Sequence, residues 1–274
     1  MRNTLIYIMA LVGLASCHTP KTALSVKSGA DSTTNEVAYP DAVEYYEPAR
    51  MKYSDEVYSD DIKSVQLHAA EWVFGPPVIW LEKQNQLTLS FDELTDNKKD
   101  YYFTFILCDA MWNPVDLPQM DFIDGFSEDP ITSFQFSVNT LVNYVHYSVS
   151  FPSENMKPKK SGNYLLQVYY NDGDEKKTVI TKRFFVAENI VGIKSEIKMA
   201  TNIELRNYQH EVDFVINKSG VDIVDPYRNL TVILQQNGRT DNMITDLKPK
   251  LVKGDELEYN FESGNIFDAN NEFR

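Results

Sequence analysis

From residue 62 onward, the chain is a series of short segments in which apolar residues alternate with polar ones or run over strand lengths. β-Branched and aromatic residues dominate these segments, as they do on pleated, half-buried surfaces. The first group is "IKSVQLH", "QLTLSFD", "YYFTFILCD", "ITSFQFSV", "YVHYSVSF", "NYLLQVYY" and "TVITKRFFV". The tetrapeptide "NDGD" at 171–174 predicts a hairpin turn, because Gly173 is free to adopt positive φ. Helical periodicity is nearly absent, so residues 58–188 are predicted to form an antiparallel, immunoglobulin-like β-sandwich.

A second group of strand-like segments begins near Ile190. It consists of "IVGIKSEIKMA", "QHEVDFVIN", "NLTVILQQN" and "ELEYNF". These segments predict a second β-sandwich over residues 189–274. They supply few strands for a closed sandwich, so we expect this second domain to be truncated at its C-terminus. The predicted fold class is therefore all-β, with tandem immunoglobulin-like antiparallel sandwiches after a signal peptide and an acidic linker.

Residues 1–17, "MRNTLIYIMALVGLASC", have the pattern of a secretory leader. Arg2 precedes an apolar run from Leu5 to Leu14 that is too short to span a bilayer as a mature helix. The run ends in "LASC", which resembles the bacterial lipobox and predicts lipidation of Cys17; the alternative is an ordinary signal peptide with a chance cysteine. Buried acyl chains contribute roughly 0.8 kcal/mol per CH₂, so several chains on Cys17 would anchor the protein to a membrane. No acid follows before Asp31, which favours the periplasmic face.

Negative charge is concentrated in the segment that follows the leader. The whole chain carries a formal net charge of −14. Residues 31–61 hold nine acidic and two basic residues, so this segment carries a net charge of −7, half of the total. Such a chain repels nucleic-acid phosphates, so we expect no binding to nucleic acid. Residues 18–57 are predicted to be a flexible, self-repelling acidic linker. The alternative is an acidic arm for a partner, with these tyrosines as anchors: Tyr39, Tyr45, Tyr46, Tyr53 and Tyr58.

The stretch "DFIDGFSEDP" at 121–130 holds four carboxylates and is the strongest candidate for chemistry. An EF-hand register with Gly125 at position six places Met120, Phe122 and Ile131 at ligand positions one, three and twelve, so the calcium hypothesis fails. A carboxylate pair for glycoside hydrolysis stays formally possible, but no spacing selects one. The simplest interpretation is a long inter-strand loop, and the second is a partner-binding loop.

Other catalytic and metal patterns fail as well. "HEVDF" at 210–214 begins like a zinc helix, but its fifth residue is Phe and the segment has a strand pattern. His18, His68, His146 and His210 are scattered, and His146 is expected on a sheet. Cys108 has no expected disulfide partner, since the other cysteine is in the leader, and is predicted to be a small buried hydrophobe. We therefore expect no catalysis, no metal and no cofactor.

The chain resembles the plug protein family of the bacterial type IX secretion system. The resemblance spans about residues 58–274 and rests on "DIKSVQLH", "QLTLSFDEL", "YYFTFILCDAMWNPVDLPQMDFIDGFSEDPITSFQFSVNT", "HYSVSFPSENMKPKKSGNYLLQVY", "QHEVDFVIN" and "ITDLKP". It implies a binding protein with no small-molecule substrate. The implied partner is a very large outer-membrane β-barrel translocon, called SprA or Sov, whose periplasmic mouth the plug closes when no cargo passes.

Size and loop composition agree with that implication. A sandwich of about 125 residues has a diameter of roughly 35 Å, a body on the scale of a wide pore. The loop "MWNPVDLPQMDFIDGF" is the expected contact segment, because large apolar side chains on polar loops are typical binding anchors. Trp112, Phe122 and Phe126 are the partner-binding candidates. The lipobox would hold the protein at the outer membrane, facing the periplasm.

An alternative from another class is a lipid-anchored glycan-binding sandwich. Exposed aromatic rings stack on sugars in such proteins, and Trp72, Trp80 and Trp112 would form the platform. The tryptophans would instead be core residues if the sandwich buries them.

Overall fold

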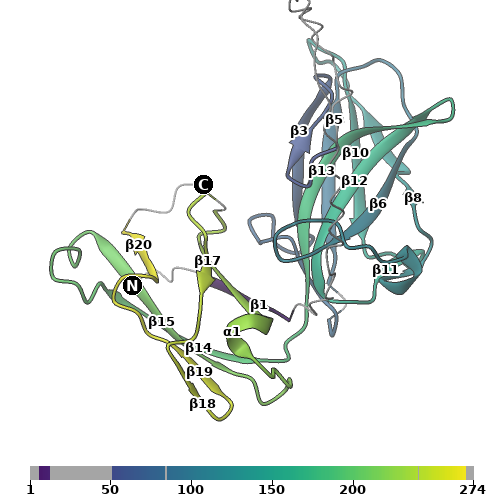
Figure 1. The fold of residues 1–274 in the computed structure, drawn as a ribbon. Coiled ribbons are helices and arrows are strands. Elements are labelled where there is room, and N and C mark those ends of the chain that lie inside the picture. Colours follow the sequence, from purple (N-terminus) through teal and green to yellow (C-terminus); the bar gives the residue numbers. More distant parts are fainter. Residues whose placement is uncertain (1–5, 13–50, 84, 240, 270–274) are drawn as a thin grey trace, which may run out of the picture. The chain divides into compact units, whose positions relative to one another are not determined.

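The computed structural model describes residues 6–12 and 51–269, apart from 84 and 240 (Figure 1). The described residues are mostly strands, with a short helix α1 (Pro226–Asn229) and a 3₁₀ turn η1 (Gln119–Asp121). Among them, no helix is long and apolar enough to cross a membrane. The predicted all-β class built from antiparallel sheets is confirmed.

The first region is formed by two sheets, which Figure 1 marks by β3, β5 and β10 and by β13, β12 and β6. One sheet has the order β3 (Ile62–Ala69), β5 (Leu87–Glu93), β10 (Val145–Phe151), β9 (Ser133–Phe136). The other has the order β2 (Glu56–Val57), β13 (Glu175–Ala187), β12 (Gly162–Asp172), β6 (Tyr101–Cys108), β8 (Asp129–Pro130), with β4 (Val78–Trp80) parallel to β13. A separate pair joins β7 (Ile123–Gly125) to β11 (Met156–Pro158).

The strand pattern explains how these sheets close on a core. In β5 every second residue is buried, so one face carries Leu87, Leu89 and Phe91 inward. Aromatic rings fill the space between the sheets, with the Phe105 ring 5.2 Å from that of Phe151. Strand β12 is joined to β13 through Gly173, whose φ is +62°, so the hairpin predicted from "NDGD" is confirmed.

The first region has two opposite ends, at which its strands begin and finish. At the exit end, β13 finishes at Ala187 and the chain continues to β14; the register also brings β6 to its end there, with Asn163 opposite Cys108. At the turn end, β12 connects to β13 and β10 begins at Val145 opposite Glu93.

The second region also has two sheets. One has the order β14 (Gly192–Met199), β15 (Gln209–Asn217), β19 (Glu256–Tyr259), β18 (Leu251–Lys253), and β20 (Ile266–Asp268) pairs with β15. The other joins β16 (Leu230–Gln236) to β17 (Ile244–Leu247) and to β1 (Ile6–Val12). The second region has a core of its own, in which the Phe214 and Tyr259 rings stack with their centres 4.5 Å apart. This core shares no residue with the core of the first region. On this basis we propose a domain boundary near residues 188–189.

Two segments of the N-terminal part differ from the simplest expectation. Residues 52–57, predicted as linker, lie on the first region: β2 pairs with β13, and Asp55 Oδ1 accepts a hydrogen bond from the Arg183 amide at 2.7 Å. Ile6–Val12 pairs antiparallel with β16 over its whole length. Cleavage before Cys17, as the leader predicts, would remove β1 and leave that edge of β16 unpaired. Cys17 itself and linker residues 18–50 lie outside the described residues.

Candidate partner interface

The β6–β7 loop begins with a tight turn built on Asp109. The Oδ1 atom of Asp109 accepts hydrogen bonds from the amides of Met111 and Asn113, both at 2.8 Å. The Asp109 backbone closes the same turn, since its amide donates to the Asn113 carbonyl at 2.8 Å. Asn163 of β12 then ties the turn to the sheet by donating from Nδ2 to the Asp109 carbonyl at 2.9 Å. Aspartate is suited to this role because its short carboxylate reaches the amides of the next residues.

Trp112 occupies the strained position of this turn. Its φ is +67°, a region that bulky side chains rarely adopt. Its ring meets the edge of Phe185 at 5.5 Å, and the guanidinium of Arg183 lies over it at 4.3 Å. Arg183 also donates from Nε and Nη2 to the carbonyl of Tyr53, and its burial lowers the pKa of the guanidinium. The half-buried Trp112 is thus fixed on the outer face of β13.

The turn, and the chain that runs back along β6 after it, expose a series of apolar side chains. The Val115 amide donates a hydrogen bond to the Leu107 carbonyl, and Gln119 Nε2 donates one to the Thr104 hydroxyl at 3.0 Å. The apolar side chains exposed here, called the β6 flank, are Met111 at 63%, Leu117 at 39%, Met120 at 75% and Phe126 at 65%. Large apolar groups held on an ordered, otherwise polar segment are typical of binding surfaces.

The acidic stretch 121–130 is a bend with structural carboxylates. Gly125 has φ of +99°, and a Cβ there would lie 2.1 Å from the Asn155 carbonyl oxygen, so only glycine fits the β7–β11 pair. Glu128 accepts from Lys176 Nζ at 2.6 Å and from the Tyr169 hydroxyl, and these bonds lower the pKa of its carboxyl group. Asp129 accepts from Ser153 Oγ at 3.2 Å. No group of three His, Cys, Asp or Glu side chains in the described part of the chain is arranged to hold a metal.

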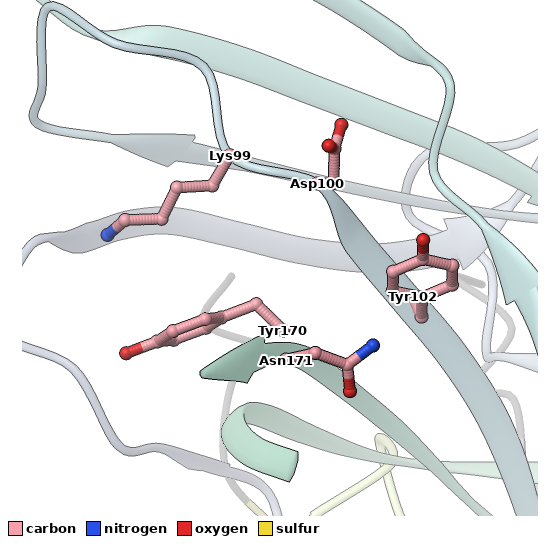
Figure 2. Close-up of a pocket in the computed structure, with 5 residues that line it drawn as sticks. All are labelled: Lys99, Asp100, Tyr102, Tyr170 and Asn171. Carbon is pink, nitrogen blue, oxygen red and sulfur yellow. The ribbon is translucent and has the colours of Figure 1, made fainter. Parts of the chain in front are cut away.

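A shallow hollow of about 290 Å³ lies at the turn end, lined by Lys99, Asp100, Tyr102, Tyr170 and Asn171. Figure 2 shows the Lys99 side chain extended along the Tyr170 side chain. The Lys99 Nζ lies 5.4 Å from the centre of the Tyr170 ring. The same ammonium is 2.5 Å from the carboxylate of Glu93, which is almost fully buried. Lys99 therefore neutralises a buried acid, and the groups around the hollow include no nucleophile paired with a base.

Comparison with known protein families identifies a match for the first region. Residues 62–188 match the family described as "Type 9 secretion system plug protein 1st domain". Residues 62–188 belong to the plug-protein first-domain family. The family resemblance predicted from the sequence is thereby confirmed for this region, and it indicates a role in type 9 secretion. The family match ends at residue 188, whereas the resemblance expected from the sequence ran to residue 274.

A solved structure extends the similarity into the second region. The crystal structure of a hypothetical protein from Parabacteroides merdae ATCC 43184 has a TM-score of 0.76 and 30% sequence identity, and the similarity covers 82% of this chain. The chain spans 56% of the length of that protein. No curated protein matches the chain.

The three partner-binding candidates take different places in the plug domain. Phe126 is exposed on the β6 flank, and Trp112 is half-buried at the turn. Phe122 is only 3% exposed and packs in the core, with its ring 6.0 Å from that of Tyr164. Burial removes Phe122 from the contact surface, because a buried ring supports the loop from beneath. The sequence pattern did not identify Met111 and Met120 as contact residues, although both lie in the expected contact segment 111–126.

The tryptophans of the plug domain do not favour the glycan-binding alternative. Lys83 Nζ lies 5.3 Å from the centre of the Trp80 ring, and Arg183 covers Trp112. Sugar stacking needs a free ring face, and in these two residues a cation lies over one face. Trp72 is 45% exposed at the exit end.

Three features that were considered for catalysis lie in strands: Cys108, His146 and the "HEVDF" segment. Cys108 is buried, and burial raises the pKa of its thiol to about 11, so it is a neutral core residue at neutral pH, as predicted. His146 lies on β10, as predicted, and its Nδ1 is 2.7 Å from the carboxylate of Asp92. The "HEVDF" segment lies in β15, as predicted. Burial alone would raise the pKa of Glu211, but bonds from Thr201 and Lys198 outweigh it and lower the pKa.

Proposed function

We propose that this protein is a non-catalytic plug that binds the periplasmic mouth of the type IX secretion translocon, an outer-membrane β-barrel of the SprA or Sov kind. It blocks the channel sterically while no cargo passes. The observation that carries the proposal is the match of residues 62–188 to the plug-protein domain family. Steric closure needs a rigid body of sufficient width and a complementary surface, and it needs no chemistry.

Two features of the plug domain support this role. A β-sandwich of about 125 residues is roughly 35 Å wide, so it is large enough to obstruct a channel built for folded cargo. The β6 flank offers exposed apolar side chains on a segment that is hydrogen-bonded to the sheet before Trp112, through Asp109 and Asn163, and after it, through Val115 and Leu107. Ordered anchors lose little entropy on binding, which favours a reversible but specific complex.

We propose further that Cys17 carries a lipid anchor that holds the plug at the outer membrane, facing the periplasm. The leader pattern "LASC" supports this part of the proposal. Anchoring raises the local concentration of the plug beside its membrane-embedded partner, so a modest intrinsic affinity suffices for occupancy.

Binding is tested by co-purification from native membranes. The tagged full chain is expected to retain a very large outer-membrane barrel protein after detergent extraction. Phe126→Ser should weaken this retention, because the exposed ring of Phe126 supplies contact area but no packing. Val224→Ser, at another exposed apolar residue in the second region, is the matched control. Retention of no barrel by the wild-type chain would refute the proposed function.

A further inference from the structure

The connection between β9 and β10 is an ordered hairpin. The Ser137 amide donates to the Tyr144 carbonyl at 2.9 Å, and the Tyr144 amide donates to the Ser137 hydroxyl at 2.9 Å. Asn139 adopts φ of +58°, which asparagine tolerates in turns. Residues 138–143, called the tip, are therefore a closed turn projecting from paired strands.

The tip exposes aliphatic side chains to an unusual extent. Val138 is 78% exposed, Leu141 is 107% exposed and Val142 is 60% exposed. Phe136, at the end of β9, adds a ring that is 53% exposed. Isolated exposed apolar residues are ordinary on protein surfaces, but a group of them on one turn is a candidate interaction site.

The tip also lies within a long uncharged segment. No Asp, Glu, Lys or Arg occurs between Asp129 and Glu154, although charged residues make up 24% of the chain. A charged side chain on a surface turn must be paired or kept hydrated when the turn enters a recess. The tip has none, so its apolar side chains can be desolvated without burying a charge of the tip.

The position of the tip in the plug domain is fixed by polar contacts at the turn end. Asn143 Nδ2 donates to the Asp96 carboxylate at 2.6 Å, which ties the tip to the β5–β6 connection. Deeper in, the Lys99 amide donates to the Tyr147 hydroxyl at 2.9 Å. The turn end is opposite the exit end, where the chain leaves at Ala187. The tip is therefore a braced projection at the end of the domain farthest from its connection to β14.

We propose that the tip inserts into an aliphatic recess on the translocon barrel, and that Leu141 is its central anchor. The proposal rests on the proposed function and adds a contact site at the turn end, distinct from the β6 flank. A lipid surface is the less suitable occupant, because membrane-surface segments combine apolar residues with Lys or Arg, and residues 130–153 contain neither. Lys98, whose Nζ lies 5.0 Å from the centre of the Phe134 ring, is already paired with Asp100 at 2.7 Å.

The test compares Leu141→Asp with Ile203→Asp in the full chain. Both side chains are fully or largely exposed, Ile203 at 82%, so both variants should keep the wild-type unfolding temperature. We expect Leu141→Asp to weaken retention of the barrel at least tenfold, and Val142→Asp to act in the same direction. Ile203→Asp should bind as the wild type does.

Each other outcome contradicts the proposal. If the wild type retains the barrel and Leu141→Asp retains it equally, the tip proposal fails while the proposed function stands. If the wild type retains no barrel, both fail together. A third arm measures sedimentation of the Cys17→Ser chain with phosphatidylethanolamine–phosphatidylglycerol vesicles; binding that Leu141→Asp abolishes would assign the tip to lipid and overturn the proposal.

Discussion

The guanidinium of Arg183 lies 4.3 Å from the centre of the Trp112 ring, while its Nε and Nη2 donate to the carbonyl of Tyr53. A single β13 side chain thus connects the β6–β7 turn to the segment that precedes β2. Trp112 and Tyr53 are both far from Arg183 in the sequence. This one side chain therefore holds together two segments that are distant along the chain.

We expect Trp112→Ala and Arg183→Ala to be coupled in a double-mutant cycle. A cation–π contact contributes about 0.5–2 kcal/mol, so the double variant should be less destabilised than the sum of the single variants by about that amount. Urea unfolding of the four proteins measures the coupling. Strict additivity would mean that the ring and the guanidinium do not interact in solution.

Substitutions of Phe122 and Phe126 should differ in their effect on stability, although the two residues are only four positions apart. Phe122→Ala removes a buried ring and should lower the free energy of unfolding by about 3–5 kcal/mol. Phe126→Ala removes an exposed ring and should change it by less than about 0.5 kcal/mol. Chemical denaturation of both variants checks this, and similar losses for the two would show that Phe126 is also a core residue.

Strand patterning made much of the fold predictable from the sequence. The alternation in "QLTLSFD" places Leu87, Leu89 and Phe91 on one face, and that face is buried. "NDGD" predicts its hairpin because the turn chemistry is local.

The candidate interface was only partly predictable, because loops have no period. Phe122 and Phe126 look alike in sequence, but β7 pairs with β11 and carries Phe122 into the core. The docking of residues 52–57 depends on Asp55 and Arg183, which are far apart in the sequence, while composition alone predicts a linker. The tip lies between two predicted strand segments, "ITSFQFSV" and "YVHYSVSF", and its lack of charge gains meaning only once the turn end is known.

The cluster of Glu128, Tyr169 and Lys176 should make stability depend on pH at both extremes. Hydrogen bonds from Lys176 and Tyr169 lower the pKa of Glu128, so its contribution is present above its unfolded pKa of about 4.3 and is lost as pH falls through the folded value. Burial and the bond to Glu128 raise the pKa of Tyr169 to about 12. Its contribution is present below an unfolded pKa of about 10 and is lost between about pH 10 and 12.

Glu128→Gln should therefore be less stable than the wild type at pH 7, and the difference should shrink below about pH 4. Thermal unfolding over the pH range measures both curves. Asp124→Asn, at an exposed carboxylate of the same stretch, is the control and should follow the wild type. A stability difference for Glu128→Gln that persists unchanged at pH 2 would contradict the role of the ionised carboxylate.

Cys17→Ser should release the protein from the membrane fraction. The predicted lipid anchor depends on the thiol of Cys17 as the acyl acceptor, so the variant should appear in the soluble fraction with altered mobility on a gel. Cys108→Ser, which changes the buried thiol of the plug domain, is the control and should leave fractionation unchanged. Unchanged membrane association and mobility of Cys17→Ser would rule out lipidation.

The central claim, that the protein closes an idle translocon, is tested most directly by uptake of a bulky antibiotic that the outer membrane normally excludes. Uptake is compared among wild-type cells, a deletion of this protein and a double deletion that also lacks the barrel. Steric plugging predicts raised uptake in the single deletion and a return to the wild-type level in the double deletion, because the open channel is then gone. A single deletion no leakier than the wild type, or a double deletion as leaky as the single one, would contradict the plug mechanism.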